Sequence, residues 1–124
     1  MRVFDAIDHR IRVLYVDDVR SPQFDLYNYK VARSTNQAIK MIEEAESVGE
    51  PFSAIDIDHD AGEYASDGGD YIKVLEWLEE TGREYVILIH SLNVVGVENM
   101  LRICQRNNWL ATCGIIVPGS LVVK

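Results

Sequence analysis

The chain has 124 residues, a length that suits one domain with a substantial hydrophobic core and is too short for two full domains. Its 48% hydrophobic and 26% charged residues exclude a disordered tail, a collagen-like chain and a disulfide scaffold, and a net charge of −8 disfavours broad nucleic-acid binding, which depends on clustered cations. No apolar run is long enough to span a bilayer, and charged residues interrupt residues 1–10 where a signal peptide needs an apolar stretch, so we expect a cytoplasmic protein without membrane attachment.

Short hydrophobic blocks alternate with amphipathic segments along the chain. The blocks predict strands at 11–16, 29–33, 52–58, 84–89 and 114–117. Apolar residues at helical spacing predict a helix that Ser34 or Thr35 caps and that Gly49 ends, and two more at 71–80 and 97–107. Between the first two strands, the short polar segment 21–28 is expected to form a short or distorted helix, and 62–69 a loop.

Alternation of strands and helices indicates the fold class. Strands that are separated by helices are typical of right-handed β-α-β crossovers, and therefore of a mostly parallel sheet. The strands are nearly continuous in apolar residues, which indicates that both faces of the sheet are covered. We therefore expect a single α/β domain over residues 1–124.

Two cysteines, Cys104 and Cys113, occur in the chain. Their separation is not the Cys-x-x-Cys spacing of a metal site. No pattern next to either residue argues for a nucleophile, so we expect two buried, unreactive thiols.

Polar residues gather directly after three of the predicted strands. The first strand is followed by Asp17-Asp18-Val19-Arg20, the third ends in Asp58-His59-Asp60, and the fourth is followed by His90-Ser91-Leu92-Asn93. In an open parallel sheet, ligands bind beyond the carboxyl ends of the strands, near the point where the strand order reverses. The sequence therefore predicts a site at this edge of the sheet.

The acidic residues of this edge suit a metal ion. Asp17 and Asp18 could form a turn or a cap, but the apolar strand before them and Arg20 after them favour a functional pair. Together with Asp58 they offer the oxygen ligands that Mg²⁺ or Mn²⁺ prefers. Arg20 is either a surface charge or a bidentate contact to phosphate.

The second cluster offers acid and base groups. Asp58 could act as a nucleophile instead of a metal ligand, and His59 is a natural general acid or base near neutral pH. Asp60 could orient this histidine or cap the following turn. Asp56 projects to the same face as Asp58, deeper in the sheet, and must be paired, hydrogen-bonded or neutral there, with a partner that the sequence does not name.

The third cluster points to phosphate contact. A lone histidine after a strand more often has a structural role. Ser91 and Asn93 beside His90 instead favour a role in phosphate contact. Ser91 offers a hydroxyl, and Asn93 could alternatively cap a helix. The chain lacks a P-loop, a Gly-x-Gly-x-x-Gly fingerprint and a Gly-x-Ser-x-Gly elbow, which argues against the chemistry of those motifs.

This layout resembles a response-regulator receiver in Asp17-Asp18, Asp58 and Ser91. The resemblance implies a three-layer α/β/α domain whose five-stranded sheet has the flavodoxin-like order 2-1-3-4-5. It also implies that Asp17, Asp18 and Asp58 hold Mg²⁺ and that Asp58 accepts phosphate. Residues 115–118 keep the proline that follows the fifth strand of a receiver but lack its lysine.

The chain more closely resembles the receiver-like family that is predicted to process cyclic phosphates. The matching motifs are Asp17-Asp18-Val19-Arg20-Ser21-Pro22, Ile57-Asp58-His59-Asp60-Ala61-Gly62, and His90-Ser91-Leu92-Asn93 with Gly96 and Glu98-Asn99-Met100. They stand in the order of that family. The resemblance implies a small phosphate ester or a cyclic nucleotide as the ligand.

Two functions follow as hypotheses, with the oligomeric state left open. The first is a phosphoesterase acting on a cyclic phosphate or a nucleotide phosphodiester. A divalent metal on Asp17, Asp18 and Asp58 would activate water, and His59 and His90 would exchange protons; a metal-independent version with two histidines is the variant. The second is a non-catalytic receiver-like module for signalling or for binding a cyclic nucleotide.

Overall fold

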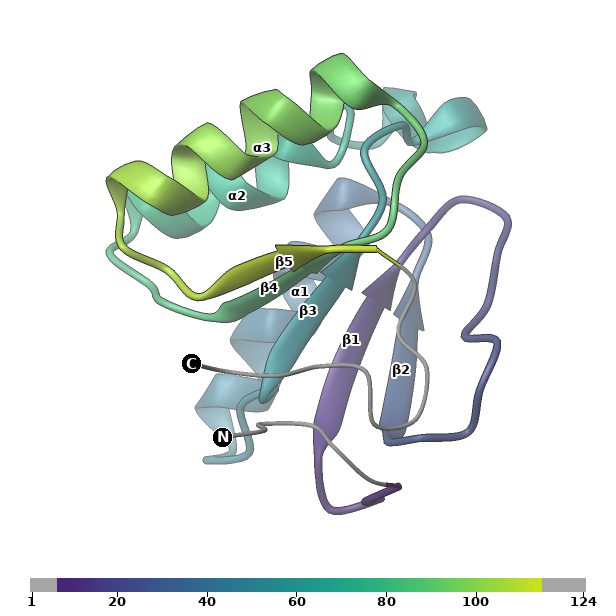
Figure 1. Ribbon diagram of the computed structural model, residues 1–124. Helices are drawn as coiled ribbons and strands as arrows, with labels where there is room; N and C mark the ends of the chain where they lie inside the picture. The colour runs from purple at the N-terminus through teal and green to yellow at the C-terminus, as the bar shows by residue number, and fades with distance from the viewer. Residues whose placement is uncertain (1–6, 115–124) are drawn as a thin grey trace.

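The computed structural model describes residues 7–114 (Figure 1). Its elements are, in chain order, β1 (Arg12–Val16), β2 (Asn28–Ala32), α1 (Thr35–Ser47), β3 (Ala54–Ile57), the short 3-10 helix η1 (Gly62–Ser66), α2 (Ile72–Glu80), β4 (Val86–Ile89), α3 (Val94–Arg106) and β5 (Ala111–Cys113). The strands form one sheet in the order β2-β1-β3-β4-β5, and every neighbouring pair is parallel. The predicted fold class and strand order are confirmed.

All three α-helices of the described chain pack against one face of this sheet. Apolar side chains of α1, α2 and α3 form a single core with alternate residues of the strands, such as Ile55 and Ile57 of β3. The strand order explains the shared face. The connections from β2 to β3, from β3 to β4 and from β4 to β5 all step in the same direction, so right-handed crossovers place their helices on the same side.

The opposite face carries the segment 17–27, which joins β1 to β2 and steps in the reverse direction. Leu26 and Tyr27 of this segment pack against apolar residues of β1, β3 and β4. The segment contains no helix, so the expected short helix at 21–28 is wrong. Its polar run around Pro22 has no apolar stripe that could bury a helix. Within residues 7–114 the second outer layer is therefore an extended loop.

Side-chain caps determine where α1 and α3 begin. Ser34 caps α1, because its hydroxyl oxygen accepts a hydrogen bond from the Gln37 amide at 3.0 Å. Asn93 caps α3 in the same way, with its Oδ1 atom 2.9 Å from the Gly96 amide nitrogen. This cap starts α3 at Val94, earlier than the predicted residue 97. The segment 62–69, expected as a loop, contains η1. No helix of the described residues is long and apolar enough to cross a membrane.

The last strand also differs from its prediction. β5 spans Ala111–Cys113, and residues 115–117 of the predicted strand lie outside the described residues. Within the described sheet β5 pairs with β4 alone, so it is less buried than the central strands and needs no apolar run. Cys113 is consequently exposed, against expectation, whereas Cys104 is buried as expected. Burial raises the pKa of the Cys104 thiol to about 11, which agrees with an unreactive residue.

Candidate functional site at the carboxyl edge of the sheet

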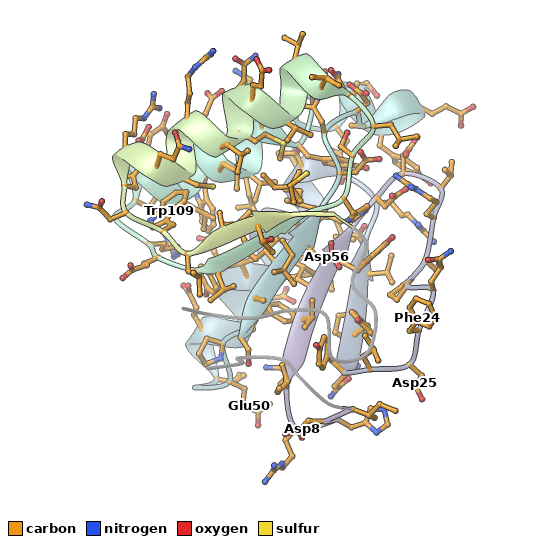
Figure 2. The ribbon with its side chains drawn as sticks, viewed as in Figure 1. Asp8, Phe24, Asp25, Glu50, Asp56 and Trp109 are labelled. Carbon is orange, nitrogen blue, oxygen red and sulfur yellow. The ribbon has the colours of Figure 1, made fainter. Side chains whose placement is uncertain are left out.

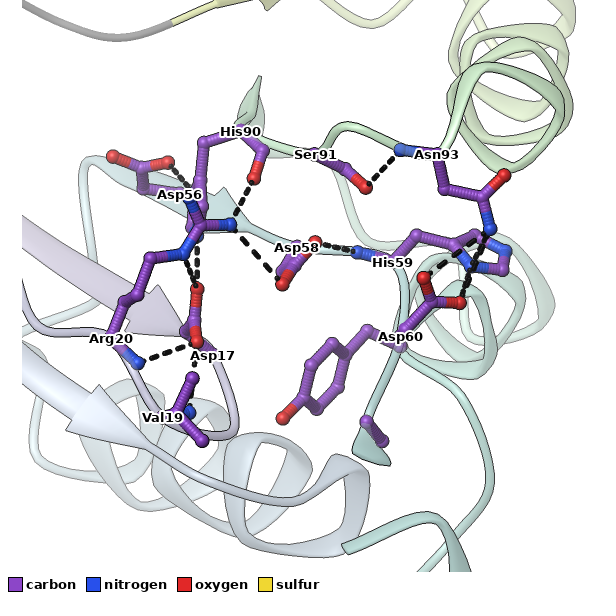
Figure 3. A network of polar contacts seen from close by, with 12 residues as sticks. Asp17, Val19, Arg20, Asp56, Asp58, His59, Asp60, His90, Ser91 and Asn93 are labelled. Atoms are coloured by element: carbon purple, nitrogen blue, oxygen red, sulfur yellow. Dashed lines mark hydrogen bonds and ion pairs between the residues drawn. The ribbon is translucent and has the colours of Figure 1, made fainter. Parts of the chain in front are cut away.

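The site lies where β1, β3 and β4 end, on the face of the sheet that carries no helix of residues 7–114. Side chains of a strand alternate between faces, so Tyr15 and Asp17 share this face, as do Asp56 and Asp58. The sheet register sets Tyr15 opposite Asp56. His90 follows β4 and points to the same place (Figure 3).

His90 is held between two buried carboxylates. Its Nδ1 atom lies 2.5 Å from Asp56 Oδ1, and its Nε2 atom lies 3.0 Å from Asp17 Oδ2. Tyr15 stacks on the imidazole, with ring centroids 4.4 Å apart. Burial disfavours the charged ring, but the hydrogen bonds and charges of Asp56 and Asp17 outweigh it, so the pKa of His90 is raised. Both ring nitrogens of His90 are therefore engaged by carboxylates.

Arg20 completes this group of side chains. Its Nε atom donates to Asp17 Oδ2 at 3.1 Å, and its Nη2 atom donates to Asp58 Oδ2 at 3.4 Å and to the His90 carbonyl at 3.3 Å. The other oxygen of Asp17 accepts hydrogen bonds from the backbone amides of Val19 and Arg20. Burial alone would raise the pKa of Asp17, but these amides and His90 lower it, so the carboxylate stays charged.

A second group forms around His59. Its Nδ1 atom lies 2.8 Å from Asp60 Oδ1, and the Asn93 side-chain amide donates to the same carboxylate at 3.2 Å. The hydrogen bond from His59 lowers the pKa of Asp60. No described residue forms a hydrogen bond with the Nε2 atom of His59. This histidine is thus oriented through one nitrogen and available through the other.

Gly96 of α3 allows the His59 ring to pack where it does. A Cβ atom at this position would lie 2.5 Å from Cγ and Cδ2 of His59, well inside van der Waals contact. The glycine therefore serves close packing and not an unusual backbone angle, because its φ is not positive. The imidazole rests directly on the first turn of α3.

The two groups lie on either side of Asp58 (Figure 3). One oxygen of Asp58 accepts from the His59 backbone amide at 2.8 Å, and the other faces Arg20. Ser91 lies next to this junction, where its Oγ atom accepts from the Asn93 amide at 3.1 Å. The sequence expected His59 and His90 to work as one pair, but the structure puts them in separate groups.

The remaining predicted site residues have defined places, although nothing tests their predicted roles. Asp18 lies against Gly62, and burial and the carboxylates of Asp17 and Asp58 raise its pKa. Asn93 is the helix cap that the sequence left as its alternative, and it also contacts Asp60.

Sequence reasoning missed three contributions to this site. It could not name His90 as the partner of Asp56, and it overlooked Tyr15 and Arg33. Arg33 donates to the carbonyls of Asp17 and Arg20 and thereby fixes the loop after β1. Alternation along β1 is a signal that could have found Tyr15, because it lies two residues before Asp17.

The donor set fits a divalent cation. Asp17, Asp58 and His90 each offer a ligand atom, and these atoms all lie within 4.8 Å of one another. The pair of His90 and Asp56 carries no net charge, and Arg20 offsets one of the three carboxylates of Asp17, Asp18 and Asp58. Two negative charges therefore remain uncompensated. Carboxylate oxygens are the ligands that Mg²⁺ and Mn²⁺ prefer, but Arg20 already contacts two of these carboxylates. An ion and this guanidinium would compete for the same oxygens.

The comparisons with known proteins bear on this edge of the sheet. A family model described as "Cyclic-phosphate processing Receiver domain" matches residues 12–106. The matched range runs from β1 through α3 and includes every site residue described above. No curated protein and no solved structure matches the chain.

Proposed function

The chain belongs to the family of cyclic-phosphate processing receiver domains, and from this premise we propose that it hydrolyses a cyclic phosphate ester at the carboxyl edge of its sheet. One observation carries the proposal. An imidazole that Asp60 orients, with its second nitrogen available, lies across Asp58 from an arginine that two carboxylates hold in place (Figure 3). A base and a phosphate-binding cation are the two groups that such a hydrolysis needs.

His59 is the proposed general base. The hydrogen bond to Asp60 sets the ring orientation and leaves Nε2 to take a proton from water. A carboxylate orients the histidine base of a catalytic triad in the same way. The side chain is only 13% exposed, so its position is well defined by packing. Removing such a base typically lowers the rate by roughly 100- to 10,000-fold.

Arg20 and Ser91 are the proposed phosphate contacts. Arg20 is about half exposed, and its Nη1 atom makes no hydrogen bond within the described chain, so it can donate to a phosphoryl oxygen. The hydroxyl proton of Ser91 has no acceptor among residues 7–114, so it can donate as well. Asp58 accepts a hydrogen bond from Arg20 at one oxygen and from the His59 amide at the other, so it links the phosphate contact to the residue that carries the base.

His90 acts as a positioning residue in this proposal. Both of its ring nitrogens lie against carboxylate oxygens, so neither is open to a water molecule. It holds Asp17, which in turn holds Arg20. This role replaces the proton exchange that the sequence suggested for His90.

The reaction then balances as follows. His59 removes a proton from water while the water oxygen forms a bond to phosphorus. The ring P–O bond breaks, and the released oxygen takes a proton from solvent to become a hydroxyl. His59 returns its proton to solvent, and the product is a linear phosphate monoester.

A divalent metal would bind at this edge in competition with Arg20 for the oxygens of Asp17 and Asp58. Asp17, Asp18 and Asp58 would hold Mg²⁺ or Mn²⁺, whose chemistry is to polarise a phosphoryl oxygen. Its charge would also offset the excess negative charge of these carboxylates.

³¹P NMR of the protein with a panel of cyclic phosphates and linear phosphodiesters tests the proposal, with Mg²⁺, with Mn²⁺ and with EDTA. We expect a monoester resonance that grows with time and that His59→Ala slows by roughly 100-fold or more. His9→Ala is the matched control, because His9 is exposed and distant in sequence from the site. Undiminished turnover in a folded His59→Ala variant would remove His59 from the mechanism.

The alternative is a receiver-like module that binds or signals without hydrolysis. It draws on Asp58, which resembles the acceptor of receivers. The chain lacks the lysine that precedes the proline of that family, since residues 115–117 before Pro118 read Ile-Ile-Val. Incubation with a small phosphodonor followed by intact mass measurement separates the two functions, because a phosphoryl adduct that Asp58→Asn abolishes would favour signalling.

A further inference from the structure

A cavity opens on the helix-free face of the sheet, next to the site but outside the proposed reaction. It has a volume of about 280 Å³ and is bounded by the loop after β1 and by the faces of β1, β2 and β3. Figure 2 shows Phe24 on this loop and Asp56 on the sheet. The residues that matter for its chemistry are Tyr15, Arg20, Phe24, Tyr29, Asp56 and His90.

Polar atoms without a protein partner line this cavity. Asp56 is 5% exposed, and among the described residues only its Oδ1 atom is hydrogen-bonded, to His90. Tyr15 is 8% exposed, and neither its hydroxyl nor that of Tyr29 forms a hydrogen bond within residues 7–114. Burial and the nearby Asp56 carboxylate raise the pKa of Tyr15 to about 12, so this hydroxyl keeps its proton. Because these residues line the cavity, a bound ligand could supply hydrogen-bond partners to their polar atoms.

Aromatic rings form the apolar part of the same cavity. Tyr15 and Tyr29 pack edge to face in its wall, with ring centroids 6.3 Å apart. Phe24 is 40% exposed on the loop at the cavity, although a phenyl ring gains free energy when it is buried. Planar aromatic ligands stack on such rings, and a cavity of this volume matches a single heterocycle with its sugar better than a large ligand.

Arg20 connects the cavity to the proposed reaction. It lines the cavity and also contacts Asp17 and Asp58 at the edge of the sheet. A ligand whose phosphate meets this guanidinium would therefore extend its organic part toward Tyr29 and Phe24. Acceptors such as Asp56 Oδ2 suit the N–H groups of a nucleobase.

We propose that this cavity binds the base of a nucleotide, so that the substrate is a nucleoside cyclic phosphate. The inference rests on the proposed function and adds the substrate class to it. A small cyclic phosphate without a base would meet Arg20 but leave the aromatic cavity empty.

Turnover of the four nucleoside 2′,3′-cyclic phosphates is compared with that of glycerol 1,2-cyclic phosphate, which has the same cyclic ester and no base. Phe24→Ala and Tyr29→Ala should lower kcat/KM for at least one nucleotide by roughly 5- to 100-fold, the range that base stacking carries, and leave the glycerol ester unchanged. Tyr64→Ala is the control, because Tyr64 is 41% exposed and does not line the cavity.

Saturation-transfer NMR with the four nucleosides, which carry no phosphate, separates this inference from the hydrolysis. One outcome is saturation that reaches the base protons, is abolished by Phe24→Ala, and occurs in a protein that hydrolyses no ester. That result would support base binding in the cavity and refute the proposed hydrolysis. Equal turnover of the glycerol ester and every nucleotide, unaffected by both variants, would overturn the inference and retain hydrolysis. Absence of transfer at millimolar nucleoside would also overturn it.

Discussion

Replacing Gly96 by alanine tests the packing of His59 on α3. The new Cβ atom would lie 2.5 Å from two ring carbons, so the imidazole or the helix must move. Overpacking of this kind typically costs about 1–3 kcal/mol, whereas the helix preference of alanine over glycine contributes up to about 1 kcal/mol in the opposite sense. We therefore expect Gly96→Ala to leave the free energy of unfolding unchanged or to lower it by up to about 2 kcal/mol.

The same substitution in a His59→Ala background should behave differently. Without the imidazole the contact disappears and only the helix preference remains, so Gly96→Ala should raise the free energy of unfolding by up to about 1 kcal/mol. The coupling between the two positions is then about 1–3 kcal/mol, as for residues in direct contact.

Urea unfolding of the four proteins, followed by the fluorescence of Trp77 and Trp109, measures this coupling. The slope with denaturant should be the same in all four, since the substitutions change packing and not the extent of the core. Effects of Gly96→Ala that agree in the two backgrounds to within about 0.5 kcal/mol would show that His59 does not pack on this turn. Activity gives a second readout, because a displaced ring loses its contact to Asp60.

Three more predictions concern charged groups. Arg20→Ala should tighten Mn²⁺ binding, measured by water proton relaxation, because it removes a competitor for two carboxylates; weaker binding would contradict that competition. The hydrogen bond from Arg106 lowers the pKa of Glu79 to about 2, so its stabilisation is present above the ordinary value of 4.5 and is lost as the pH falls from there towards 2. Glu79→Gln should reduce the loss in free energy of unfolding as the pH falls from 4.5 towards 2. An unchanged loss would show that Glu79 does not cause it. Asp56→Ala should lower the free energy of unfolding by roughly 3–5 kcal/mol, because it leaves the buried His90 with one carboxylate; chemical denaturation showing a loss below about 1 kcal/mol would argue against a structural pair.

The local pattern of the sequence was sufficient to predict the parallel sheet and its helices. The apolar residues of α1 recur at helical spacing, and Ala38, Ile42 and Ala45 are indeed buried. The same pattern placed three polar clusters at the ends of β1, β3 and β4, where the structure brings them together. Both results depend on backbone periods and on parallel strands, which neighbouring residues determine.

The sequence was less informative where few neighbours constrain the chain. It placed the last strand at 114–117, of which 115–117 lie outside the described residues, and it did not predict β5 at Ala111–Cys113; it also expected Cys113 to be buried. It also expected a helix after β1, where the structure has an extended loop. At these places the tertiary surroundings outweigh local preference.

Only the tertiary structure decided the roles that the histidines can take. The carboxylates on His90 come from positions 34 and 73 residues earlier in the chain, so no local pattern could pair them. His59 owes its packing to Gly96, on a helix that follows the next strand. Whether a histidine can accept a proton or only position its neighbours depends on what meets its two nitrogens, and folding alone brings those partners together.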